Sequence, residues 1–241
     1  MSYVDGFVLA VPAHNKEAYR QFAANAVALF KEFGATRMVE TWGDDVPDGK
    51  VTDFKSAVQA KADEVIVFSW LEYPDKASRD AAGAKMMSDP RMKDMGTAMP
   101  FDGKRMIFGG FAVIVDGGAA GDATPGYIDG SLLPVPGDKQ AAYRDLVALQ
   151  AVIISEHGAS RVVEAWGDDV PDGKVTDFAR AVKAEGDEKV AFSWIEWPSK
   201  DARDAGWKKV FADPRMHPDK AGRFYDEARR VIGGFAPLLV A

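Results

Sequence analysis

The chain has 241 residues, 47% of them hydrophobic and 28% charged, with a net charge of −7 and a pI near 5.1. This composition is typical of a folded globular protein, and the acidic balance disfavours nucleic acid or an anionic membrane as a partner, because such binding depends on clustered Lys and Arg. The lack of cysteine excludes disulfides, thiol catalysis and thiolate metal sites.

The sequence contains one long segment twice. Tyr3–Ala112 returns as Tyr127–Ala236 at a constant offset of 124 residues, without a gap and with about half of the positions identical. Such a repeat indicates two copies of one structural unit that complete each other's core. We therefore predict repeat 1 over residues 1–115, a flexible Gly/Ala-rich linker over 116–126 and repeat 2 over 127–241.

The first repeat begins with a β-branched and apolar run over residues 3–11, which predicts a strand. Apolar residues then recur at spacings of three and four up to Phe33, which predicts an amphipathic helix with Asn15 as its N-cap and Gly34 as a left-handed C-cap. Alternation over 37–42 predicts the second strand.

The rest of the repeat continues with a turn-rich segment over 43–54 and a short helix. The run 65–73 is the most strand-like in the chain. Asp75 is placed to cap a helix that ends near Asp89, because a proline follows there. A last strand over 105–115 closes the repeat.

The order β-α-β-β-α-β is that of a ferredoxin-like unit, an α+β fold whose helices cover one face of an antiparallel sheet. The other face would expose a large apolar surface. We therefore predict that two tandem ferredoxin-like units pack sheet to sheet as an intramolecular pseudo-two-fold α/β barrel. The units have edge strands that could pair with another chain, so the sequence leaves further homo-oligomerisation open.

Several motifs together resemble a known family. They are Tyr-Val-Asp-Gly, Glu-x-Trp-Gly-Asp-Asp-Val-Pro-Asp-Gly-Lys-Val-Thr-Asp-Phe, Phe-Ser-Trp-x-Glu, Asp-Pro-Arg-Met and Gly-Gly-Phe. Over nearly the whole of both repeats the chain resembles the uncharacterised bacterial YbaA-like proteins, domain of unknown function 1428. The resemblance implies the dimeric α/β-barrel superfamily, which includes cofactor-free monooxygenases, isomerases, haem-degrading enzymes and plain ligand binders, so it implies no particular activity.

The two middle strands of each repeat alternate Glu and Trp with other residues. Glu40 and Trp42 share one face of their strand, as do Trp70 and Glu72, and we expect Glu40 to lie opposite Glu72. The side chains predicted to line the space between the sheets are the catalytic candidates Glu40, Glu72, Glu164 and Glu196 and the ligand-binding candidates Trp42, Trp70, Trp166 and Trp194.

An aromatic interior with a few carboxylates is typical of a small-molecule pocket, so the sequence predicts binding of a small, partly apolar molecule between the sheets. The alternative is a cofactor-independent enzyme, monooxygenase- or isomerase-like, whose desolvated glutamates act as acid and base. A structural role stays open as well: the Trp rings then fill the interface, and the glutamates pair with arginines that recur in both repeats, Arg37, Arg91, Arg105, Arg161, Arg215 and Arg229.

Metal and haem sites are disfavoured. The loop over 43–54 holds Asp44, Asp45, Asp48 and Asp53, but turns require the same residue types, so we expect a lid or brace at the barrel mouth and no metal. The repeats share none of the three histidines, so we expect no haem or other cofactor. The N-terminus lacks the features of a signal peptide, which predicts a cytoplasmic protein.

Overall fold

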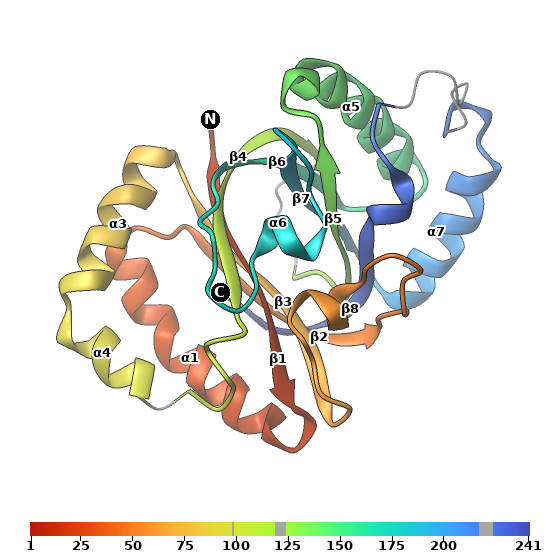
Figure 1. Ribbon diagram of the computed structural model, residues 1–241. Coiled ribbons are helices and arrows are strands. Elements are labelled where there is room, and N and C mark those ends of the chain that lie inside the picture. The colour runs from red at the N-terminus through yellow and green to blue at the C-terminus, as the bar shows by residue number, and fades with distance from the viewer. Residues whose placement is uncertain (98, 119–123, 217–223) are drawn as a thin grey trace.

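The computed structural model describes residues 1–97, 99–118, 124–216 and 224–241. Its centre is a closed barrel of eight antiparallel strands in the order β1-β3-β2-β8-β5-β7-β6-β4, and β4 pairs back to β1 (Figure 1). The chain is thus an α+β protein built from two similar halves, as predicted.

Each half contributes four strands and its own helices. The first half comprises β1 (Tyr3–Pro12), α1 (Lys16–Phe33), β2 (Arg37–Asp45), α2 (Phe54–Ala57), β3 (Glu64–Tyr73), α3 (Lys76–Ser88), α4 (Pro90–Thr97) and β4 (Ile107–Gly118). The second comprises β5 (Tyr127–Val135), α5 (Gln140–Glu156), β6 (Arg161–Asp169), α6 (Phe178–Ala181), β7 (Lys189–Trp197), α7 (Lys200–Ala212) and β8 (Val231–Val240). The α4 helix is an addition to the predicted elements of the first half.

The caps explain where several helices begin and end. Asp75 precedes α3, and its side chain accepts a hydrogen bond from the Ser78 N–H at 2.7 Å, as expected for an N-cap. Gly34 ends α1 with φ +118°, a conformation that other residues rarely adopt. Asn15 occupies the N-cap of α1, but its side chain donates to the Pro100 carbonyl instead of capping the helix.

The halves join through the edges of their sheets. β2 pairs with β8, and β4 pairs with β6. These four strands are therefore not available for pairing with another chain, because the edge strands of each half pair with those of the other half. β4 runs through Gly118 and so includes the first three residues of the segment predicted as a linker, 116–126, of which residues 119–123 lie outside the described part of the chain.

Helices cover two opposite sides of the barrel, α1, α3 and α4 on one side and α5 and α7 on the other (Figure 1). The short helices α2 and α6 instead lie together over one end of the barrel. Thr52, just before α2, donates to the Ala181 carbonyl at 2.6 Å, and Thr176 donates in return to the Ala57 carbonyl at 2.6 Å. The predicted brace at the barrel mouth is thus formed by both turn-rich loops together.

Aromatic rings fill the barrel. Phe68 and Phe192, from β3 and β7, stack with ring centroids 4.5 Å apart. Phe54 and Phe178 enter from α2 and α6 and meet the strand aromatics edge to face. Rings in such arrangements add packing energy to the burial of their surface, so the interior is a hydrophobic core that holds the two halves together.

Candidate functional site

The register of the middle strands differs from the prediction. Residue Arg37 lies opposite Glu72, and Glu40 lies opposite Ser69, so the expected pairing of Glu40 with Glu72 is wrong. The connection between β2 and β3 is long and contains α2, which means that no tight turn fixes the register from local sequence.

The two predicted Glu/Trp faces also point to opposite sides of the sheet. Trp70 belongs to the core inside the barrel, together with Val39 from β2. Trp42 packs outside it, against residues of β1 and α1 such as Tyr19. Trp194 and Trp166 repeat this division in the second half. The structure thus separates the predicted residues into an inner set, with Glu72 and Glu196, and an outer set, with Glu40 and Glu164.

The inner set is an ion-pair network that closes the barrel interior. Arg161 donates from both terminal nitrogens to Glu72, at 2.9 Å each. Arg37 donates to Glu196 at 2.5 and 2.9 Å and to Glu72 at 3.2 Å. Burial pushes the pKa of Glu72 up, but the hydrogen bonds and charge of Arg161 outweigh it and hold that pKa below its usual value. Glu72 and Glu196 are thus each held by an arginine of the set that recurs in both repeats.

The two inner indoles leave no room for a ligand between them. Trp70 and Trp194 lie against each other with ring centroids 4.5 Å apart, and each is 1% exposed. Their N–H groups donate to Glu72 and Glu196, at 3.0 Å in both cases. A ring cannot be inserted between partners already at contact distance, so the predicted position of a ligand between these tryptophans is not supported.

The outer set of the first half is a buried carboxyl cluster between β2, β3 and α1. Tyr19 donates its hydroxyl hydrogen bond to Glu40 Oε2 at 2.5 Å, and Ser69 is a second hydrogen-bond partner of Glu40. Burial raises the pKa of Glu40 to about 7, although both hydrogen bonds act to lower it. No Lys, Arg or His of the described chain forms an ion pair with Glu40, which is thus poised to gain or lose a proton near neutral pH.

The surroundings of Glu40 are largely aromatic and aliphatic. The Tyr19 ring meets Phe22 and Phe101 at 6.5 and 5.8 Å between centroids. The half-buried Met106 joins Trp42 in the same outer cluster. The Lys16 ammonium lies 5.2 Å from the centre of the Trp42 ring on the solvent side. We call the set Tyr19, Glu40, Trp42, Ser69 and Phe101 the Glu40 site.

The second half repeats the cluster with one change of charge. Tyr143 donates to Glu164 at 3.0 Å, and Ser193 is again a partner. Burial raises the pKa of Glu164 to about 7, while Arg230 and these hydrogen bonds oppose the rise. Arg230 stands where the first half has Met106, and it donates to Ser131, which stands where the first half has Phe7. The second cluster is therefore the more polar of the two.

Sequence reasoning missed the partners of these carboxyls. Tyr19 and Ser69, with their copies Tyr143 and Ser193, were absent from the predicted site. Their signal was present, because both are polar, identical between the repeats and placed on apolar faces of their elements. What was missing is the register that brings Ser69 opposite Glu40.

The aspartates of the turn-rich loops connect the halves. Asp44 accepts from Tyr127 at 2.9 Å and pairs with Lys200. Asp53 accepts from the backbone N–H groups of Ser56 and Gly49 at 2.6 and 3.0 Å and thereby fixes the turn before α2. Among the described residues no group of three His, Asp or Glu side chains could hold a metal ion, and none of the described helices is long and apolar enough to cross a membrane.

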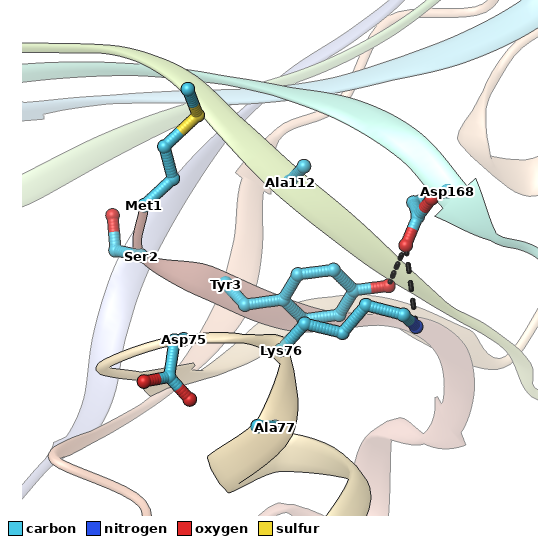
Figure 2. A pocket seen from close by; sticks show the side chains of 8 residues that line it. All are labelled: Met1, Ser2, Tyr3, Asp75, Lys76, Ala77, Ala112 and Asp168. Atoms are coloured by element: carbon cyan, nitrogen blue, oxygen red, sulfur yellow. Dashed lines mark hydrogen bonds and ion pairs between the residues drawn. The ribbon is translucent and has the colours of Figure 1, made fainter.

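A depression of about 360 Å³ lies at one junction of the halves (Figure 2). Among its lining residues, Tyr3 donates to Asp168 at 3.0 Å, and Lys76 pairs with the same carboxylate at 3.3 Å (Figure 2). The corresponding residues of the other junction are Tyr127, Asp44 and Lys200, which make the reciprocal contacts. This repeated pairing across the halves indicates an interface brace.

The model of a family described as protein of unknown function (DUF1428) matches the chain twice, over residues 2–103 and 126–227. The chain belongs to the DUF1428 family. The protein called uncharacterized protein YbaA in Escherichia coli K12 is 68% identical over 116 residues, 48% of this chain and 99% of YbaA, and that of Shigella flexneri matches equally well. One YbaA corresponds to one half of the chain, so the resemblance and the tandem duplication are confirmed.

Solved structures share the fold over the full chain. A provisionally named monooxygenase from Fusobacterium nucleatum superposes with a TM-score of 0.62 at 8% identity, over 99% of this DUF1428 chain and 93% of its own. Another monooxygenase named in the same way, from Lactobacillus acidophilus, gives a TM-score of 0.59 at 10% identity, over 100% of this chain and 95% of its own. An anthrone oxidase-like protein gives a TM-score of 0.51 at 12% identity, over 100% of this chain and 92% of its own. At these identities the likeness establishes the fold alone.

Proposed function

We propose that this protein is a cofactor-independent enzyme that binds a small, partly aromatic molecule at the Glu40 site and moves a proton on it. The observation that carries the proposal is a carboxyl with pKa about 7, held by Tyr19 and without a cationic partner among the described residues. A general acid or base works best when its pKa lies near the working pH. The site replaces the position between the sheets that the sequence predicted.

The chemistry follows from the two states of the carboxyl. As a carboxylate, Glu40 takes a proton from a weakly acidic C–H or O–H group of the substrate, and as a carboxylic acid it returns that proton to a different atom. Tyr19 and Ser69 hold the side chain in one orientation through both states. The rings of Trp42 and Phe101 supply an apolar surface suited to an aromatic substrate.

The names of the fold neighbours favour one particular reaction of this kind. Two are named monooxygenases and one is called anthrone oxidase-like. Proton removal by Glu40 from an activated CH₂ group would leave a carbanion, which dioxygen oxidises to C=O; one oxygen atom enters the product and the other leaves as water. The substrate is itself the reductant, so this step needs no cofactor. Oxygen uptake therefore distinguishes it from an isomerisation, which consumes none.

The test uses deuterium exchange and oxygen uptake on a panel of enolisable aromatic ketones and phenols. We expect Glu40→Gln to abolish turnover and leave binding within a few-fold, and the rate of the unmodified protein to rise with pH around 7 as Glu40 ionises. Glu164→Gln is the matched control and should leave most of the turnover. Full activity of Glu40→Gln would disprove the proposal, and ligand binding without turnover on any substrate would favour a binding protein instead.

We further propose that the halves are related by a pseudo-two-fold axis and that the protein works in the cytoplasm. The reciprocal contacts of Thr52 with Ala181 and of Thr176 with Ala57 support the axis, as do the matching pairs at the two sheet junctions. The lack of cysteine is compatible with a reducing compartment. Superposition of the halves in a crystal structure and cell fractionation test these two statements.

A further inference from the structure

The two halves differ sharply beneath helices α3 and α7, on the outer face of the barrel and away from the Glu40 site. In the second half the carboxylate of Asp129 is enclosed by donors. Trp197 and Trp207 both give their indole N–H to Asp129 Oδ2, at 2.8 and 2.7 Å, and Arg203 donates to Oδ1 at 2.9 Å. The rings of the two tryptophans lie 6.0 Å apart and cover the carboxylate.

The first half keeps the acceptor and the arginine but has lost both indoles. Asp5 stands at the position of Asp129 and accepts from Arg79 at 2.7 Å. Tyr73 stands where the second half has Trp197, and Gly83 where it has Trp207. The Tyr73 hydroxyl is buried and has no hydrogen-bond partner among the described residues. A buried polar atom left unsatisfied costs stability unless something supplies its partner.

The space next to Gly83, the position that holds Trp207 in the second half, is open to an added Cβ. A Cβ built on Gly83 meets no atom within 4 Å outside its own helix backbone and chain neighbours. Gly83 lies one helical turn after Arg79, on the side of α3 from which Arg79 reaches Asp5. Of the two methionines one turn further along α3, Met86 packs against the cluster that contains Tyr73, and Met87 is 91% exposed.

From these observations we infer that the first half has a binding site for a flat aromatic molecule with a ring N–H, of the indole class, between α3 and β3. The ligand takes the place of the missing Trp207 ring beside Gly83. Its N–H donates to the Asp5 carboxylate as Trp207 does to Asp129, and a polar atom of the ligand can satisfy the Tyr73 hydroxyl. We call this the Gly83 site.

The experiment measures binding of indole and of 1-methylindole to the full chain by calorimetry. We expect one equivalent of indole to bind, and 1-methylindole, which lacks the N–H, to bind at least tenfold more weakly. Gly83→Trp supplies the ring from the chain itself and should abolish binding. Gly83→Leu should also abolish binding, and it serves as the blocking variant if Gly83→Trp does not fold.

The second half provides the converse test. Trp207→Gly opens the equivalent space there and should raise the stoichiometry from one indole to two. The substitution should also lower the melting temperature, and added indole should partly restore it. Glu40→Gln should leave indole binding unchanged. A failure of indole to bind at the Gly83 site is therefore distinguishable from a failure of the function proposed for the Glu40 site. The inference is overturned if indole does not bind, if 1-methylindole binds equally well, or if a folded Gly83 variant still binds indole.

Discussion

Replacement of Glu40 by Gln should change how the stability of the protein depends on pH. The pKa of this carboxyl rises from 4.5 in the unfolded chain to about 7 in the folded protein, mainly because of burial. Between these values the unfolded chain releases a proton that the folded protein retains, so folding stability falls as pH rises and levels off above about 7. At about 1.4 kcal/mol per pH unit, the loss from this group amounts to about 3 kcal/mol.

The assay compares free energies of unfolding in urea at pH 4.5 and pH 8. Because Gln does not ionise, the stability of Glu40→Gln relative to the unmodified protein should increase by about 3 kcal/mol between the two pH values. The change with pH is informative even if the variant loses its hydrogen bond to Tyr19, since that loss is common to both conditions. Glu17→Gln is the control on the exposed face of α1: a hydrogen bond from Arg20 lowers the pKa of Glu17, so its replacement should give no increase in relative stability between pH 4.5 and pH 8. A pH-independent difference for Glu40→Gln would refute the raised pKa.

Three further changes test other parts of the structure. Arg161→Met leaves Glu72 without its bidentate partner and should cost about 3–5 kcal/mol in urea unfolding; a loss below about 1 kcal/mol would contradict a structural ion-pair network. Tyr19→Phe removes a hydrogen bond that lowers the pKa of Glu40, so the pH profile of turnover should move to higher pH, and an unchanged profile would exclude Glu40 as the titrating group. A fragment of residues 1–118 leaves the edges of β2 and β4 unpaired and should sediment as a dimer, whereas a stable monomer would show that the halves do not depend on each other.

The sequence predicted which residues of the candidate site share a face of a strand, but not which face lies inside the barrel. The alternation on residues 37–42 correctly places Glu40 and Trp42 on one face of β2, because a strand turns its side chains to alternate sides. It does not say which face is inside. Both faces of this strand are apolar enough to be buried, since Val39 meets the barrel interior while Trp42 meets the residues beneath α1. The choice depends on neighbouring strands and helices that local sequence does not describe.

The ion pairs between the two halves could not be predicted from the sequence either. The arginines that recur in both repeats were recognised as possible partners of the glutamates, but Arg161 reaches Glu72 in the opposite half. Such contacts join residues far apart in the chain and depend on how the barrel closes. The loss of an indole at Gly83 likewise becomes meaningful only because Trp207 shows where that ring would lie.

By itself the sequence determined the duplicated unit, the order of its strands and helices, and the family. Those follow from local periodicity, capping residues and the repeat, which depend little on distant contacts. The tertiary structure decided the strand register, the closure of the barrel through β2–β8 and β4–β6, and the division of the glutamates into inner ion pairs and outer carboxyls. Burial and charge pairing are properties of the assembled barrel, and they decide which of four similar carboxyls are held in ion pairs with arginine and which have a raised pKa.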